Sequence, residues 1–323
     1  YAVDQFFVNG GSRAYIMRVA PSDAKTAQYD GPLFAVAAKN PGAWGNQIQL
    51  FCQPASKART QIYEDLGGRK YRVKNSAGFQ EGDAVVFVGG EEPVRTTVVS
   101  VRDNVIELAD SLGDDVVDTG LLPLKVLQTQ EFNLQVVYGD ETETYENVSF
   151  NAAAANYVNK AVSRSALVEV TAKSGASIAD LFAEGDTYAV LLSGGSDGSL
   201  SGVDASVFIG EDRGPGKRTG IQAFVDNDEV SLMAIPGVTE PAVQLALVSH
   251  CENLGSRFAV LDIPRDKTKV PDVLAHRDIF DSSYAAMYNP WVQVFDPLEK
   301  RNIFIPPSGS VLGVYARSDN TRG

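Results

Sequence analysis

The chain has 323 residues, of which 44% are hydrophobic and 21% are charged, an ordinary globular composition that at this length predicts two or three domains. Its formal net charge is −13, which argues against a nucleic-acid or anionic-membrane partner, and the sequence contains no run of five like charges. No apolar run is long enough to span a bilayer. The only cysteines, Cys52 and Cys251, exclude a disulfide framework and a cysteine-rich zinc site, and we expect two buried free thiols.

The first twenty residues predict a helix followed by a strand. Residues 2–9 carry apolar side chains at helical spacing, and Gly10 and Gly11 supply a left-handed stop. Residues 13–19 alternate and are rich in strand formers. Because so short a stretch cannot bury a core of its own, we expect it to join another part of the chain.

The next stretch predicts many strands. Residues 33–51 contain two strands on either side of a turn at Asn40, Pro41 and Gly42. From 57 to 128, short strands alternate with glycine and aspartate turns about every ten residues, which is typical of a small all-β barrel or sandwich. The expected strands here are 71–74, 84–88, 96–101 and 105–108.

The stretch from 132 to 201 predicts a hairpin, a helix, two more strands and a loop. The hairpin alternates on both sides of a turn at Gly139 and Asp140. The expected elements are strands 132–138 and 142–148, helix 152–163, strands 166–171 and 188–192, and loop 193–201.

After residue 219, apolar strands alternate with amphipathic helices. Thr239 is the expected N-cap of one helix, and Gly255 is its expected stop. This alternation predicts a sheet that is at least partly parallel and covered on both faces. The expected helices are 219–225, 239–254 and 271–280, with a short one after 309, and the expected strands are 229–235, 258–263, 291–295 and 303–305.

The predicted fold is an α/β core built from both chain ends, with β-rich domains inserted into it. The core sheet is expected to be mixed and partly parallel, with helices on both faces. The expected domains are a core of 1–30 and 190–323, a β-rich α+β insertion of 31–56 and 129–189, and a small all-β outer domain of 57–128.

One motif suggests an enzyme. Residues 194–198, GGSDG, match the G-x-S-x-G elbow of α/β-hydrolases, and Ser196, Asp262 and His276 follow the chain order of that family's triad. The elbow should lead directly into a helix, yet the next residues are loop-like. A serine hydrolase therefore stays as the alternative to a non-enzymatic protein.

Three weaker patterns predict no site. The glycine-rich stretch 210–219 lacks the spacing of a phosphate loop and has Arg218 where a serine or threonine would bind magnesium. The acidic group at Asp226, Asp228 and Glu229 lacks EF-hand spacing. The two histidines would both be needed for a histidine-based metal site. We therefore expect no cofactor and no metal.

Six segments together carry a family resemblance. They are DQFFVNGGSRAYIMRV (4–19), AKNPGAWGNQIQL (38–50), LLSGGSDG (191–198), RTGIQAFVDNDEVSLMAIPG (218–237), SSYAAMYNPWVQVFDP (282–297) and IPPSGSVLGVYARSDNTRG (305–323). In this order they resemble the contractile tail sheath proteins of bacteriophages and R-type bacteriocins. Residues 57–128 carry no such motif. The motif turns are Gly10, Gly11, Asn40, Pro41, Gly42, Trp44, Pro306, Pro307 and Gly309.

The resemblance implies a structural protein that polymerises helically around a tail tube and contracts to drive the tube through a bacterial envelope. Its implied partners are further copies of itself, the tail tube protein, and baseplate and tail terminator proteins. The implied location is the virion tail, after synthesis in the host bacterial cytoplasm. It also implies that the GGSDG loop is structural, which weighs against the hydrolase.

The last residues allow two interpretations. Arg317, Asp319 and Arg322 form either a solvated, self-paired helix end or a set that braces the inner core. Because residue 1 is tyrosine and the chain stops at Gly323, we expect a protein truncated at both ends that lacks the family's extended arms. Such a fragment is expected to be monomeric or weakly associating.

Overall fold

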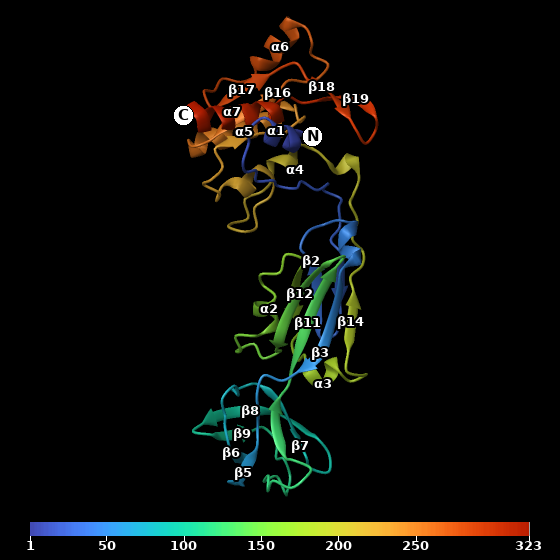
Figure 1. Ribbon diagram of the computed structural model, residues 1–323, viewed down its shortest axis with the longest axis vertical. Helices are drawn as coiled ribbons and strands as arrows, with labels where there is room; N and C mark the ends of the chain where they lie inside the picture. Colours follow the sequence, from blue (N-terminus) through green and yellow to red (C-terminus); the bar gives the residue numbers. More distant parts are fainter. Residues whose placement is uncertain (323) are drawn as a thin grey trace. The chain divides into compact units, whose positions relative to one another are not determined.

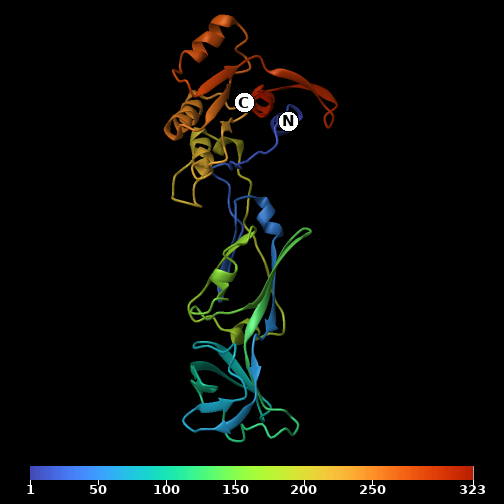
Figure 2. The ribbon, with the colours of Figure 1, turned by 60° about the vertical axis from the view of Figure 1, so that its left-hand side comes forward.

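The computed structural model describes residues 1–322 and shows a mixed α/β protein with several separate sheets (Figures 1 and 2). The chain divides into two compact units, Tyr1–Ser22 with Ser199–Gly323, and Asp23–Gly198, and the last residue lies outside the described part. We call them the terminal unit and the inserted unit. Both chain ends thus build one unit, whereas the expected three-part division and its bounds stay a prediction.

The terminal unit contains a parallel sheet of three short strands in the order β15-β16-β17. The antiparallel strands β18 and β19 form a separate sheet, so the expected mixed sheet is replaced by a parallel sheet and an independent hairpin. The elements are α1 (Ala2–Val8), η2 (Leu200–Gly202), α4 (Ala205–Ile209), η3 (Gly220–Phe224), β15 (Leu232–Met233), α5 (Pro241–Leu254), β16 (Phe258–Asp262), α6 (Val270–Arg277), β17 (Ala285–Tyr288), β18 (Val292–Asp296), β19 (Arg301–Ile305) and α7 (Ser308–Arg322).

The middle strand β16 contacts helices through alternate residues. Ala259 and Leu261 share an apolar core with α5. The ring of Phe258 packs on Tyr315 of α7, and the Asp262 side chain bonds Ser308 at the start of that helix. Successive side chains of a strand point to opposite faces, so α5 and α7 contact different faces of β16.

Helix α5 begins and ends close to the predicted residues. Gly255, with a φ of 69°, ends it in the left-handed conformation as expected. The expected cap at Thr239 is wrong by one residue, since Glu240 is the N-cap and makes no side-chain capping bond. Pro241 occupies the first turn, where its missing N–H costs no helical hydrogen bond.

The start of the chain confirms the helix but not the strand. Helix α1 ends before Gly10, whose φ is 117°, and it packs against α7. Residues 13–19 form no strand, although their composition predicts one. The physical reason is that no described strand lies alongside to take up their backbone hydrogen bonds.

The inserted unit contains two apolar cores. The first, core A, lies between the sheets β1-β2-β13 and β12-β11-β3-β14. It forms one cluster of buried side chains, whose first residue is Ala27 and whose last is Leu192. Its elements are β1 (Gln28–Asp30), β2 (Phe34–Ala38), η1 (Ala43–Gln47), β3 (Gln49–Ala55), β11 (Glu131–Tyr138), β12 (Glu141–Val148), α2 (Val158–Ala161), β13 (Val168–Ala172), α3 (Ile178–Leu181) and β14 (Tyr188–Leu191).

The hairpin and both strands beside the Asn40 turn are confirmed, although β2 and β3 belong to different sheets. The expected helix 152–163 is wrong in length, because only Val158–Ala161 is helical. Residues 152–156 form turns in which Asn151 Oδ1 accepts from Ala153 N–H at 3.0 Å. Such local side-chain bonds compete with helix formation.

The second, core B, lies inside an antiparallel seven-stranded sheet between residues 59 and 129. The strands predicted there are present, and three more join them. In sheet order they are β4 (Arg59–Thr60), β10 (Val126–Thr129), β7 (Ala84–Val88), β8 (Val94–Arg102), β9 (Val105–Leu108), β6 (Lys70–Val73) and β5 (Ile62–Asp65).

Candidate functional site

The hairpin of β18 and β19 is a largely exposed part of the terminal unit. The strands pair from Val292↔Ile305 to Asp296↔Arg301, and neither outer edge pairs with another described strand. Large apolar side chains stand in solvent, with Phe295 at 62% and Leu298 at 88% exposure. An isolated two-stranded sheet is only marginally stable in water, and open edges are templates for another strand.

Several contacts fix the base of this hairpin to the terminal unit. Trp291 Nε1–H donates to the carbonyl oxygen of Ile263 at 2.9 Å, directly after β16. Ile305 is buried at the other end. The guanidinium of Arg265 lies 4.6 Å from the ring centre of Phe304, a cation–π contact. The base is therefore anchored and the edges are left open.

The hairpin turn is held by Asp296. Its Oδ1 accepts from the backbone N–H of Leu298 at 2.9 Å and of Glu299 at 3.3 Å. A hydrogen bond from Tyr1 is the main cause that holds the pKa of Asp296 below its usual range, and it raises the pKa of Tyr1 to about 12. The first residue of the chain thus contacts the hairpin.

A second incomplete surface lies at residues 12–19. They border a cavity of about 600 Å³, whose other walls are α1, η3, residues 229–236 and α7. Ile16 is 71% exposed, and the side chains of Arg13 and Tyr15 both contact the Glu229 carboxylate. The outer edge of β15 also lines this cavity and pairs with no described strand. The extended segment and the sheet edge therefore both line the cavity, and neither forms a ladder there with a described strand.

Two of the six motifs interlock in the inserted unit. Asn46 Nδ2 donates to the Gly195 carbonyl oxygen at 2.8 Å, and Gly195 N–H donates back to Asn46 Oδ1 at 2.8 Å. Ala43 N–H donates to Asp197 Oδ1 at 2.9 Å. A β-carbon on Gly195 would lie 2.5 Å from the Gly42 carbonyl oxygen, so the position demands glycine. Asn40 and Pro41 lead into this turn, and Trp44 packs edge-on against Tyr138.

The first and last motifs meet where α1 packs on α7. A β-carbon on Gly309 would lie 2.4 Å from the Ala2 carbonyl oxygen, and one on Gly313 would lie 2.4 Å from that of Phe6. Gly11, tight against the Phe6 ring, ends the α1 side of the contact. The turn at Pro306 and Pro307 precedes α7 directly.

The three charged residues of α7 are not gathered into a site. Arg317, Asp319 and Arg322 are all exposed, and no ion pair joins them to each other or to another described residue. The Arg317 β-carbon packs beside Gly10, and Asp319 lines the cavity. Ion pairs among these three residues therefore do not fix their positions. That they brace the core stays a proposal.

The hydrolase candidates have other partners. His276 Nε2 lies 2.9 Å from Gln244 Oε1, and the Asp262 carboxylate accepts from Ser308 and from Gly237, so no hydrogen bond joins this acid to this histidine. Ser196 belongs to the inserted unit, where its backbone pairs with Lys25. The triad's acid–base contact is absent from the terminal unit.

The weaker motifs are held by internal ion pairs. Arg218 contacts Asp212 and Asp226, and Glu229 contacts Arg13. Within residues 1–322, no three histidine, cysteine, aspartate or glutamate side chains gather as metal ligands, and no helix has the length and hydropathy to cross a bilayer.

Sequence reasoning located the motif turns but missed the open edges. Both hairpin strands were predicted as strands. The sequence did not indicate β17, which pairs with β16 in the parallel sheet, while the hairpin forms a sheet of its own. The available signal was the alternation of residues 292–296 and 301–305 around Pro297, which is typical of a hairpin.

The chain is similar in structure to the sheath tail protein from Desulfitobacterium hafniense, at a TM-score of 0.36 and 12% identity. The match covers 98% of this chain and 48% of that protein, so this chain spans about half of its length. The likeness is too distant to support a statement on fold or function. No protein-family model matches the chain, and no curated protein does.

Proposed function

We propose that this chain is a structural subunit of a contractile tail sheath. In this proposal it polymerises helically around a tail tube, and a change to a shorter and wider lattice drives the tube through a bacterial envelope. Its partners are copies of itself, the tube protein, and baseplate and terminator proteins, and its place is the virion tail after synthesis in the host cytoplasm. The α/β core, with its sheet covered on both faces, would form the inner lattice.

The observation that carries the proposal is the anchored hairpin with two open edges. Strand β18 belongs to segment 282–297, and β19 leads into segment 305–323 at Ile305; these two segments resemble sheath proteins most distinctively. A helical sleeve needs contacts that are repeated from copy to copy and do not close on themselves. Strands added from neighbouring copies would cover Phe295 and Phe304 and complete the sheet. The energy for contraction would then be stored in subunit contacts, with no nucleotide.

Charge placed on the hairpin strands tests the proposal. We expect Phe295→Lys combined with Phe304→Lys, in the natural gene, to abolish tail sleeves seen by electron microscopy, because lysine on an edge strand opposes pairing. Leu298→Lys, in the hairpin turn, adds one lysine off the strands and is expected to leave sleeves intact. Normal sleeves in the double variant, or a protein located outside the tail by immunogold labelling, would contradict the proposal.

A further inference from the structure

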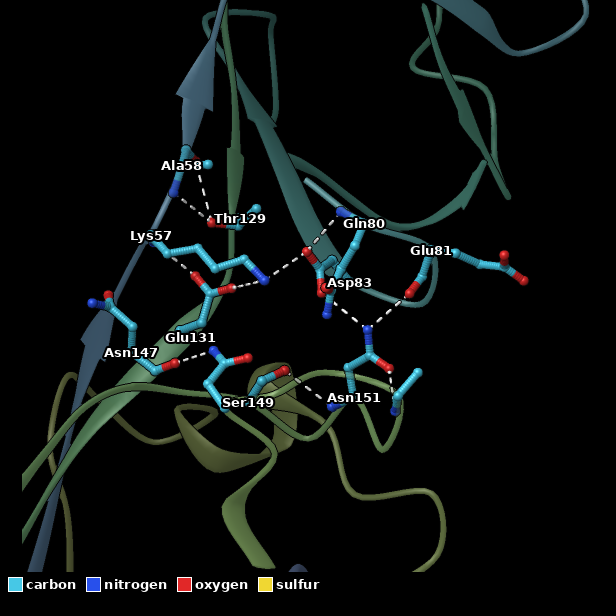
Figure 3. A network of polar contacts seen from close by, with 12 residues as sticks. Lys57, Ala58, Gln80, Glu81, Asp83, Thr129, Glu131, Asn147, Ser149 and Asn151 are labelled. Carbon is cyan, nitrogen blue, oxygen red and sulfur yellow. Dashed lines mark hydrogen bonds and ion pairs between the residues drawn. The ribbon is translucent and has the colours of Figure 1, made fainter. Parts of the chain in front are cut away.

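The chain passes between core A and core B of the inserted unit on two neighbouring strands. The outgoing strand β3 continues into β4, and the returning strand β10 continues into β11. The pairs Ala55↔Glu131 and Arg59↔Gln128 show that the two passages lie side by side. Between them, at the junction, lies a cluster of charged side chains (Figure 3).

One lysine holds carboxylates from both sides of the junction. Lys57 Nζ lies 2.8 Å from Asp83 Oδ2, which precedes β7, and 3.4 Å from Glu131 Oε1, on β11. Both carboxylates are only 1% exposed. Lys57 N–H also donates to Glu131 Oε2 at 2.9 Å. Lys57, on the outgoing passage, therefore binds the returning passage by backbone and by side chain, and core B by side chain.

A neutral side chain crosses the junction a third time. Asn151, after β12, donates from Nδ2 to Asp83 Oδ1 at 3.0 Å and to the Glu81 carbonyl oxygen at 2.9 Å. Gln80 N–H also donates to Asp83, at 3.1 Å. The Glu81 side chain is exposed, and Figure 3 shows it pointing away from the cluster. The charges that face one another are thus one ammonium and two carboxylates.

We propose that Lys57, Asp83 and Glu131 form a proton-sensitive joint, which holds the two parts of the inserted unit as one body and holds them more firmly when Glu131 carries a proton. With Glu131 ionised, the buried cluster has one negative charge in excess, and a buried unpaired charge is costly. With Glu131 protonated, Lys57 and Asp83 remain as a balanced pair. Burial raises the pKa of Glu131, as this charge count requires.

The sign of the pH effect follows from that shift. A carboxyl whose pKa is raised in the folded state binds a proton more readily there than in the unfolded chain. Acidification that protonates Glu131 therefore strengthens the joint. When Glu131 is ionised, Lys57 still contacts both carboxylates, but the cluster carries one negative charge in excess.

The test compares three variants with spin labels on the two parts. Asp103→Cys, in the β8–β9 turn, and Asp140→Cys, at the β11–β12 turn, provide exposed labelling sites, and the two native thiols are buried. We expect the distance distribution between the labels to be broader at an alkaline pH, where Glu131 is ionised, than at an acid pH, where it is protonated. Glu131→Gln should be narrow at both, and Lys57→Met should be broad at both.

Lys39→Met, which removes a surface pair with Glu169, is the matched control and should behave like the wild type. Thermal unfolding gives a second readout, in which Glu131→Gln raises the midpoint by about 3 °C at neutral pH and loses this advantage in acid. If Lys57→Met does not fold, the comparison of wild type with Glu131→Gln still decides. The proposal is overturned if wild type and Glu131→Gln give the same distance distribution at every pH and unfold at the same midpoint temperature.

Discussion

The carboxylate of Asp262 accepts two hydrogen bonds from Ser308, from the backbone N–H at 3.0 Å and from the hydroxyl at 2.7 Å. It accepts a third from Gly237 N–H at 3.0 Å. Asp262 ends β16, and Ser308 begins α7, so one buried side chain joins the central strand, the loop after β15 and the C-terminal helix. A carboxylate at a helix N-terminus also interacts favourably with the helix dipole.

Removing this carboxylate should destabilise the terminal unit. We expect Asp262→Ala to lower its unfolding free energy by about 3 kcal/mol, because two buried donors of Ser308 and the part-buried Gly237 N–H lose their acceptor. Asp262→Asn keeps the shape and one oxygen and should cost less. Urea unfolding followed by tryptophan fluorescence of Trp291 measures the change, and the exposed Asp281→Ala is the control. Equal stability of Asp262→Ala and the control would falsify this role.

Gly309→Ala should release α1 from α7. Alanine favours a helix over glycine by about 1 kcal/mol, but its β-carbon would lie 2.4 Å from a backbone oxygen of α1, and overpacking costs about 1–3 kcal/mol. We expect the second effect to win and chymotrypsin to cut faster at Phe6 and Phe7. Ser318→Ala, exposed on the same helix, should cleave at the wild-type rate. Slower cleavage of Gly309→Ala would mean that helix propensity decides.

His250 should make the terminal unit less stable in acid. Burial, aided by the nearby Arg257 guanidinium, lowers the pKa of His250 to about 4. The unfolded chain, with a pKa near 6.5, binds the proton first, so stability is complete above about pH 6.5 and falls toward pH 4, by about 3 kcal/mol at most. Histidine NMR resonances measure this directly. A His250 signal that titrates near pH 6.5 in the folded protein contradicts the expectation.

Both thiols should be inert in the folded protein. Burial raises the pKa of Cys52 to about 12 and that of Cys251 to about 11, and the thiolate is the reactive form. An aromatic disulfide reagent at neutral pH should therefore release no colour until denaturant is added, and then two equivalents per chain. Release of one equivalent without denaturant would show that one of the two sites opens.

A fluorophosphonate probe separates the structural proposal from the serine enzyme. Since His276 is hydrogen-bonded to Gln244 and not to Asp262, the acid–base pair that a triad needs is not formed by these two residues, and we expect no labelling. Ser196→Ala is the control that identifies the labelled atom. Stoichiometric labelling that disappears in Ser196→Ala would favour the hydrolase.

Local patterns predicted local structure well. The hairpin around Gly139 and Asp140 follows from alternation beside a two-residue turn, and its strands pair from Tyr138↔Glu141 to Leu134↔Tyr145, with a register shift before Phe132↔Val148. The stop of α5 at Gly255 likewise depends only on neighbouring residues. Neither of these two predictions needs information on distant residues, so the sequence alone is sufficient for both.

Structure that depends on distant partners was not predictable in the same way. Residues 13–19 have the composition of a strand but pair with no described strand, whereas β17 has little strand signal and is paired along β16. The candidate site is of this second kind: the glycines of the motifs were found, but the open edges of the hairpin depend on which strands the remainder of the fold leaves unpaired. The charged joint at Lys57 also joins residues that are far apart in the chain.

The two side-by-side passages between core A and core B have a consequence for how this protein can vary. Thr129 N–H donates to the Ala58 carbonyl oxygen at 2.9 Å, so the chain enters and leaves core B at neighbouring, paired residues. Core B is thus an insertion between β3 and β11, equivalent in connectivity to one long loop. The entropy cost of closing a loop grows only slowly with its length. Relatives could therefore exchange, enlarge or delete this module as a cassette, and an engineer could graft a foreign domain at Ala58 and Thr129 while β3 and β11 stay paired.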